Sequence, residues 1–100
     1  MKRKIIFAPL ARLEFEGAAA WYEEQRPGLG DEFRVEVNAT LQQVLQNPER
    51  HRLASASIHE IPLKRFRKYS LYYSIELDAI NVVSVFHGAR HPAELRRRLK

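Results

Sequence analysis

The stretch that decides the fold is YSLYYSIELDAINVVSVF, residues 69–86. From Tyr69 to Leu77, apolar and polar side chains alternate, which predicts a strand with one covered face. From Ile80 to Phe86 most side chains are apolar, which predicts the most buried strand of the protein. Because only Asp78 and Ala79 separate these runs, we expect the two strands to pair as a β-hairpin.

Two helical patterns precede this hairpin. Pro9 suits the first turn of a helix that continues to Gln25 with one apolar stripe. The turn Pro27–Gly30 ends that helix, and a second helix runs from about Asp31 to Asn47-Pro48. The short connection predicts an antiparallel helix hairpin. The first stripe consists of Leu10, Leu13, Gly17, Ala20 and Trp21, and the second of Phe33, Val37, Leu41, Val44 and Leu45.

Three shorter elements complete the pattern. Lys4 to Phe7 and Ile58 to Leu63 are typical of strands, and Pro92 can begin a short C-terminal helix. Helices followed by a run of strands indicate an α+β fold. We therefore predict an N-terminal strand, an antiparallel helix hairpin packed on a small, mostly antiparallel sheet, and a short C-terminal helix. We expect the other face of the sheet to carry Tyr72 and basic neighbours.

Length and composition narrow the class of protein. The chain has 100 residues, of which 45% are hydrophobic and 29% charged, so we expect one globular domain over residues 1–100. Without cysteine there is no disulfide, thiolate zinc site or cysteine nucleophile. No apolar run is long enough for a membrane span, and the run broken at Pro9 is too short for a signal peptide. We expect a cytoplasmic protein with no membrane partner.

Positive charge is concentrated in the second half of the chain. Residues 1–50 carry seven Lys or Arg against eight Asp or Glu, a net charge of −1, and residues 51–100 carry ten against four, a net charge of +6. A basic half is typical of domains that bind a polyanion, either nucleic acid or an acidic protein segment. The alternative is a solvated basic face that keeps the protein soluble.

Basic and aromatic side chains are interleaved around Phe66. Such a surface can neutralise phosphates and stack on unpaired bases. The alternative is a basic turn with Phe66 inserted in the core. The candidate polyanion-binding residues are Lys64, Arg65, Arg67, Lys68, Tyr72, Arg90, Arg96, Arg97 and Arg98.

A second hypothesis concerns catalysis after the buried strand. A histidine can transfer a proton and an arginine can stabilise a phosphorane-like transition state. Lys64, Arg67, His87 and Arg90 could therefore cleave RNA through its own 2′-hydroxyl without a metal, although His87 could equally be a structural residue. His87 and His91 are spaced by four, but Pro92 follows directly, so we expect no metal site. We also expect no cofactor, because no glycine-rich phosphate loop is present.

Several stretches together resemble the RelE/ParE superfamily of bacterial type II toxins, and the ParE branch in particular. The resemblance spans nearly the whole chain, and its first stretch is the most specific. The matching stretches are Trp21 to Gly30 (WYEEQRPGLG) with Phe33, then Asn47-Pro48, then Leu63 to Phe66 leading into Tyr69, Tyr72 and Tyr73, and finally His87 to Arg90 with Pro92.

The resemblance implies a toxin of a toxin–antitoxin system. Its antitoxin would be ParD-like, with an acidic C-terminal segment that wraps the toxin and an N-terminal part that binds operator DNA, so the toxin would reach that DNA only indirectly. The ribosome-dependent RNases of the superfamily use several Lys or Arg with a late Tyr or acid/base residue, and the C-terminal Tyr is absent here: after Pro92 the chain reads Ala93, Glu94, Leu95 and then arginines. The resemblance therefore implies inhibition of DNA gyrase without enzymatic activity. A metal-independent mRNA endoribonuclease and a binding module without activity remain the alternatives.

Overall fold

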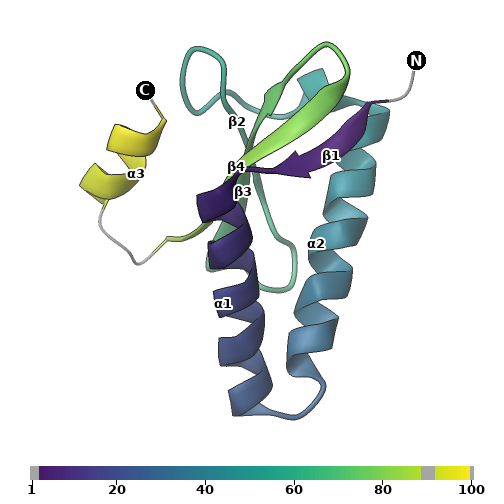
Figure 1. Cartoon of the computed structure of the whole chain (residues 1–100), viewed down its shortest axis with the longest axis vertical. Coiled ribbons are helices and arrows are strands. Elements are labelled where there is room, and N and C mark those ends of the chain that lie inside the picture. The colour runs from purple at the N-terminus through teal and green to yellow at the C-terminus, as the bar shows by residue number, and fades with distance from the viewer. Residues whose placement is uncertain (1–2, 89–91, 100) are drawn as a thin grey trace.

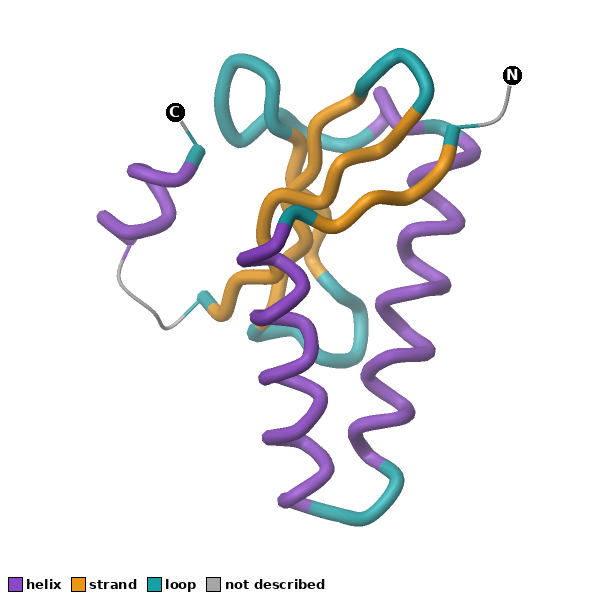
Figure 2. Tube along the Cα trace, viewed as in Figure 1, coloured by secondary structure: helices purple, strands orange, loops and turns teal. Residues whose placement is uncertain are grey.

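The computed structural model describes residues 3–88 and 92–99, and all the predicted elements are present (Figures 1 and 2). Within these residues no helix is long and apolar enough to cross a membrane. In chain order the elements are β1 (Lys4–Phe7), α1 (Pro9–Gln25), α2 (Leu29–Gln46), the 3-10 turn η1 (Pro48–Arg50), β2 (His59–Pro62), β3 (Tyr69–Ile75), β4 (Ala79–His87) and α3 (Pro92–Arg98).

The four strands form one mixed sheet in the order β1-β4-β3-β2. The predicted hairpin is confirmed: β3 and β4 are antiparallel, with Leu71 opposite Val85, and β2 is antiparallel to β3. β1 is parallel to β4, and the chain between them passes through the helix hairpin, β2 and β3. The α+β prediction is therefore confirmed, with one parallel pair. β3 ends at Ile75, two residues earlier than predicted, and Leu77 is exposed in the turn.

The turn between α1 and α2 is held by one carboxylate. Glu23 accepts hydrogen bonds from the backbone N–H groups of Gly28 and Gly30, at 2.9 and 3.0 Å. Gly28 has a φ of 89°, a left-handed conformation that glycine adopts without strain. Gly30 is needed for a different reason: a Cβ there would lie 2.5 Å from the backbone oxygen of Ala19. The two helices therefore approach closely at this end.

The helix hairpin covers one face of the sheet. Of the two apolar stripes predicted for its helices, only the stripe of α2 is buried. Phe33, Val37 and Val44 of α2 are fully buried, which confirms the predicted stripe. The stripe predicted for α1 is wrong, because Leu13 is 68% exposed and Trp21 is 55% exposed. α1 instead packs through a face of smaller side chains, which lets its backbone approach α2 and β4. That buried face consists of Ala11, Phe15, Ala18 and Ala19.

The other face of the sheet is also covered, contrary to the prediction of an open basic surface. In Figure 1 the strands lie between α2 and α3. Tyr72, which alternates with the core residues Leu71 and Tyr73, is only 7% exposed. Its hydroxyl donates a hydrogen bond to Glu60 at 2.9 Å. Burial and this carboxylate raise the pKa of Tyr72. The prediction that Tyr72 offers a stacking surface to a ligand is therefore wrong.

Candidate functional site

The predicted cations begin in the loop between β2 and β3, which we call the basic loop (Lys64–Lys68). The loop is fixed at three places. The N–H of Leu63 donates to the oxygen of Tyr69 at 3.1 Å, and Gly88 donates to Lys68 at 2.6 Å. Phe66 is buried in the core, where its ring centroid lies 5.2 Å from that of Phe33. The prediction of a basic turn with Phe66 inserted in the core is therefore confirmed, and the four cations of the loop are all exposed.

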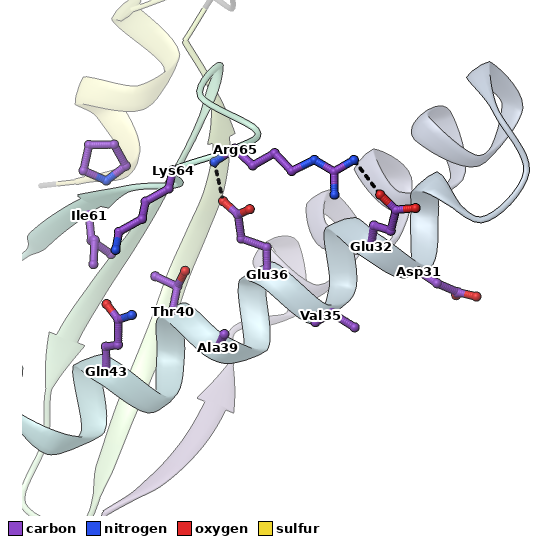
Figure 3. A pocket seen from close by; sticks show the side chains of 11 residues that line it. Asp31, Glu32, Val35, Glu36, Ala39, Thr40, Gln43, Ile61, Lys64 and Arg65 are labelled. Carbon is purple, nitrogen blue, oxygen red and sulfur yellow. Dashed lines mark hydrogen bonds and ion pairs between the residues drawn. The ribbon is translucent and has the colours of Figure 1, made fainter.

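Arg65 joins the basic loop to α2 (Figure 3). Its backbone N–H donates to Glu36 at 2.9 Å, and its guanidinium forms an ion pair with Glu32. Glu32 also pairs with Arg26 at 3.4 Å, and the hydrogen bonds from Arg65 and Arg26 lower the pKa of Glu32. Arg65 is thus engaged within the molecule.

A groove of about 480 Å³ runs beside this contact, between α2 and the end of β2. Lys64 lines it together with Ile61 and Thr40 (Figure 3). Three acidic side chains of α2, Asp31, Glu32 and Glu36, lie along the same groove. Lys64 therefore belongs to a surface of mixed charge.

A second cavity, of about 650 Å³, lies on the other side of the basic loop. We call it the aromatic–basic cavity. It is lined by side chains from the end of α1, the basic loop and the ends of β3 and β4, segments that the fold brings together. The lining residues are Trp21, Tyr22, Arg65, Phe66, Arg67, Lys68, Tyr69 and His87.

Edge-to-face ring contacts build the wall of this cavity. The centroids of Tyr22 and Phe66 are 4.7 Å apart, with an interplanar angle of 66°. Those of Tyr69 and His87 are 4.9 Å apart at 88°. Burial, with a smaller contribution from Glu36, raises the pKa of Tyr22. The cavity therefore combines aromatic rings with cations.

The cations near the C-terminus differ from those of the basic loop in what they contact. Arg98 donates to the carboxylate of Glu14 on α1 and to the backbone oxygen of Val83, the latter at 2.8 Å. Glu14 also accepts from the hydroxyl of Ser84 and the N–H of Val85. The side chains of Glu14 and Arg98 are 11% and 17% exposed, so this ion pair is mostly excluded from water. Arg98 anchors α3, and the prediction that it is free to meet a polyanion is wrong.

The exposed stripe of α1 borders this anchor. Leu10, Leu13 and Gly17 line a groove of about 380 Å³ with Glu94 and Arg98 of α3. We call the exposed side chains of Leu10, Leu13 and Trp21 the apolar face of α1. Large apolar side chains that are aligned and exposed on one helix are typical of a protein-binding surface.

The fold thus brings together only part of the predicted site. Arg67, Lys68 and His87 line one cavity, whereas Lys64 lines the groove beside α2. Arg96 and Arg97 are exposed on α3, and Arg90 lies outside the described residues. Among residues 3–88 and 92–99, no group of His, Cys, Asp or Glu could hold a metal ion.

Sequence reasoning missed two residues of these surfaces. One is Glu14, because no sequence signal connects it to Arg98, 84 positions away. Trp21 was assigned to the core. A signal for its exposure did exist, because Ala11, Phe15, Ala18 and Ala19 form a second apolar stripe on the same helix.

Comparison with known proteins gives one family. The family model described as the ParE toxin of the type II toxin–antitoxin system parDE matches residues 5–92. No curated protein matches the chain significantly.

Solved structures show the same fold. A chain of the chromosomal ParDE system from P. aeruginosa superposes with a TM-score of 0.74 at 9% identity, covering 86% of this chain and 96% of that one. A mutant of the E. coli toxin RelE in the free state gives a TM-score of 0.67 at 18% identity, covering 98% and 94%. The same mutant bound to a peptide of its antitoxin RelB gives 0.61 at 21%, covering 100% and 96%.

Proposed function

Because this chain belongs to the ParE toxin family of type II toxin–antitoxin systems, we propose that its target is DNA gyrase and that a cognate antitoxin neutralises it. The family match over residues 5–92 carries this proposal. In keeping with the composition, the proposed location is the cytoplasm and the proposed unit is a single toxin domain over residues 1–100.

One structural observation favours gyrase over mRNA as the target. The hypothetical ribonuclease centre needs Lys64, Arg67 and His87 around one phosphate. Lys64 lines the groove beside α2, whereas Arg67 and His87 line the aromatic–basic cavity. The described part of the centre is therefore divided between two surfaces.

Gyrase poisoning is tested with purified toxin, gyrase and supercoiled or relaxed plasmid. We expect the toxin to inhibit supercoiling and to trap a gyrase–DNA cleavage complex, which denaturation converts to linear plasmid. Unchanged supercoiling together with no trapped complex would contradict the proposal.

The ribonuclease alternative is tested in parallel, because Arg67, Lys68 and His87 do share one cavity. A translating extract is incubated with the toxin, and the mRNA is mapped for cuts within translated codons. We expect intact mRNA. Cuts that disappear in Arg90→Ala and His87→Ala would support the ribonuclease instead.

The antitoxin proposal is supported by the apolar face of α1. A partner that buries Leu10, Leu13 and Trp21 gains the free energy of removing apolar surface from water. The P. aeruginosa structure is described as a ParDE system, and the E. coli RelE structure holds an antitoxin peptide. We propose a ParD-like antitoxin with an acidic C-terminal segment, through which the toxin is linked to operator DNA indirectly.

A further inference from the structure

One exposed aromatic ring of the apolar face of α1 also lines the aromatic–basic cavity. Trp21, the single tryptophan of the chain, is 55% exposed at the edge of this cavity. Its nearest aromatic partner is Tyr22, with centroids 5.2 Å apart and an interplanar angle of 82°. Among residues 3–88 and 92–99 no ring stacks on the indole, so a planar group can lie against it.

The three cations that line this cavity differ in their partners. Arg65 is engaged by a carboxylate, as is Arg98 on α3. Arg67 and Lys68 are exposed and have no ion-pair partner within residues 3–88 and 92–99. No Asp or Glu is among the described residues that line the cavity, and both Glu32 and Glu36 on α2 are bound to Arg65. The cavity therefore attracts anions.

The shape of the cavity limits what the anion can be. Its volume of about 650 Å³ lies within the range of about 300–1,000 Å³ that is typical of ligand pockets. Rings of Phe66 and Tyr69 form its wall, so the ligand must offer an apolar or planar part as well as a negative charge. A peptide of acidic residues alone would pair with the cations and leave the aromatic rings unused, whereas a nucleotide matches both.

We propose that the aromatic–basic cavity binds one unstacked nucleobase of a single-stranded nucleic acid, with Trp21 stacking on the base and Arg67 and Lys68 neutralising the adjoining phosphates. This binding goes beyond the proposed function, because it requires neither gyrase nor antitoxin. A strand whose bases are stacked on one another cannot use the site, and neither can a duplex, because their bases are not free to stack on the indole.

Trp21 itself reports on the binding, since its fluorescence is the only tryptophan signal. The purified toxin is titrated with a ten-nucleotide oligo(dT), with oligo(U) of equal length, with a DNA duplex and with inorganic polyphosphate. We expect both single strands to quench the fluorescence more strongly than the duplex, and polyphosphate to bind without comparable quenching. The two single strands distinguish DNA from RNA as the source of the base.

Variants separate stacking from charge, with binding measured by the anisotropy of labelled oligo(dT). Base stacking on an aromatic ring changes affinity by about five- to 150-fold, so we expect Trp21→Ala to weaken binding at least fivefold and Trp21→Phe to restore part of the loss. Val35→Ala, on the exposed side of α2, is the matched control and should leave affinity unchanged. Circular dichroism verifies that each variant is folded.

The charge arm uses the salt dependence of the same complex. A plot of log affinity against log salt concentration has a negative slope. The double variant Arg67→Gln/Lys68→Gln should make this slope less negative by about 1.4, the value for two phosphate contacts on a single strand. Arg50→Gln, an exposed arginine outside the cavity, is its control and should leave the slope unchanged.

Three results would overturn the proposal: no binding of either single strand, duplex binding as tight as single-strand binding, or full affinity in Trp21→Ala. Displacement of oligo(dT) by a glutamate decapeptide more readily than by polyphosphate would likewise overturn it, in favour of a peptide site. Each outcome is independent of the gyrase assay, so the two proposals fail separately.

Discussion

A single side chain, that of Glu23, stabilises the turn between the helices. The backbone N–H groups at the start of a helix have no partner within the helix, and they carry the positive end of its dipole. Glu23 reaches across from α1 and accepts from two of them, at Gly28 and Gly30. Because Gly28 itself offers no capping side chain, the preceding helix supplies the cap.

The two helical glycines should respond to alanine in opposite directions. At Gly30 the new Cβ would meet the oxygen of Ala19 at 2.5 Å, so Gly30→Ala should lower the free energy of unfolding by about 2 kcal/mol. At Gly17 nothing lies within 4 Å, so Gly17→Ala should raise it by about 0.5–1 kcal/mol through helix propensity. Urea denaturation measures both, and equal effects of the two substitutions would contradict the close approach of the helices.

Tyr73 makes stability sensitive to alkaline pH. Its side chain is fully buried, its hydroxyl donates to the backbone oxygen of Pro48 at 2.6 Å, and burial raises the pKa of Tyr73 to about 12. In the unfolded chain the hydroxyl ionises near pH 10. Between pH 10 and 12 the folded state therefore holds this proton and the unfolded state does not, so the free energy of unfolding falls as pH rises.

The measurement is a series of urea denaturations from pH 9 to pH 11.5. We expect stability to be constant up to about pH 10 and to fall above it, and Tyr73→Phe should fall less steeply because it cannot ionise. Tyr73→Phe begins from lower stability, since the oxygen of Pro48 loses its donor, so the slopes are compared. Parallel slopes would mean that Tyr73 does not contribute to the decrease.

At the scale of elements, α3 is a short helix that one ion pair holds in place. Arg98 connects it to Glu14 of α1 and to Val83, where β4 extends beyond the last residue paired with β1. Ser55 adds a hydrogen bond from its hydroxyl to the oxygen of Leu99 at 3.3 Å. A helix of seven residues is not stable alone, so its place depends on these contacts.

Arg98→Ala should therefore release α3 while the rest of the fold remains. Breaking a mostly buried ion pair costs several kcal/mol, and we expect about 2 kcal/mol here because Glu14 keeps its bonds from Ser84 and Val85. Hydrogen exchange in residues 95–99 should become much faster. Arg97→Ala removes the same charge from an exposed position and should change stability by less than about 0.5 kcal/mol. Equal exchange in both variants would contradict the anchor.

At the scale of the whole molecule, the apolar and the charged surfaces meet at Trp21. Leu10 and Leu13 of the apolar face of α1 lie beside α3, whereas Trp21 lines the aromatic–basic cavity with Arg67 and Lys68 of the basic loop. The cations of the second half do not form one open face, because Arg65 and Arg98 are paired and Lys64 lines the groove beside α2. A long acidic antitoxin segment can meet both surfaces, whereas either surface alone offers only one kind of contact.

Antitoxin binding should depend on the apolar face more than on charge. Leu10→Ala and Leu13→Ala should each weaken the antitoxin complex by about tenfold, from the loss of buried apolar area. Leu77→Ala, at an exposed leucine in the turn between β3 and β4, is the control. Raising the salt from about 0.1 M to about 1 M screens charges and not apolar contacts, so we expect most of the affinity to remain. Complete dissociation at high salt would contradict this binding mode.

The order of the elements follows from local pattern, because periodicity along the chain reports local conformation directly. In α2 the large buried residues from Phe33 to Val44 recur every three or four positions, so they lie on one face of the helix. The β3–β4 hairpin was predictable for the same reason, since the alternation and the short turn both lie within residues 69–86. The stretch from Trp21 to Gly30 was the most specific of the stretches that together indicated the family.

The tertiary structure alone decided which surfaces are available for function. α1 has two apolar stripes. The stripe of Ala11, Phe15, Ala18 and Ala19 is buried, because α2 approaches the backbone of α1 at Gly30. Leu13 and Trp21, on the other stripe, are therefore left exposed. Strand alternation placed Tyr72 on the far face of the sheet but could not show that this face is covered. Arg98 pairs with Glu14, 84 positions away in the sequence. Only the packing of the folded chain brings these two charges together. Sequence patterns describe local conformation, whereas burial and ion pairing depend on the elements that meet in the folded chain.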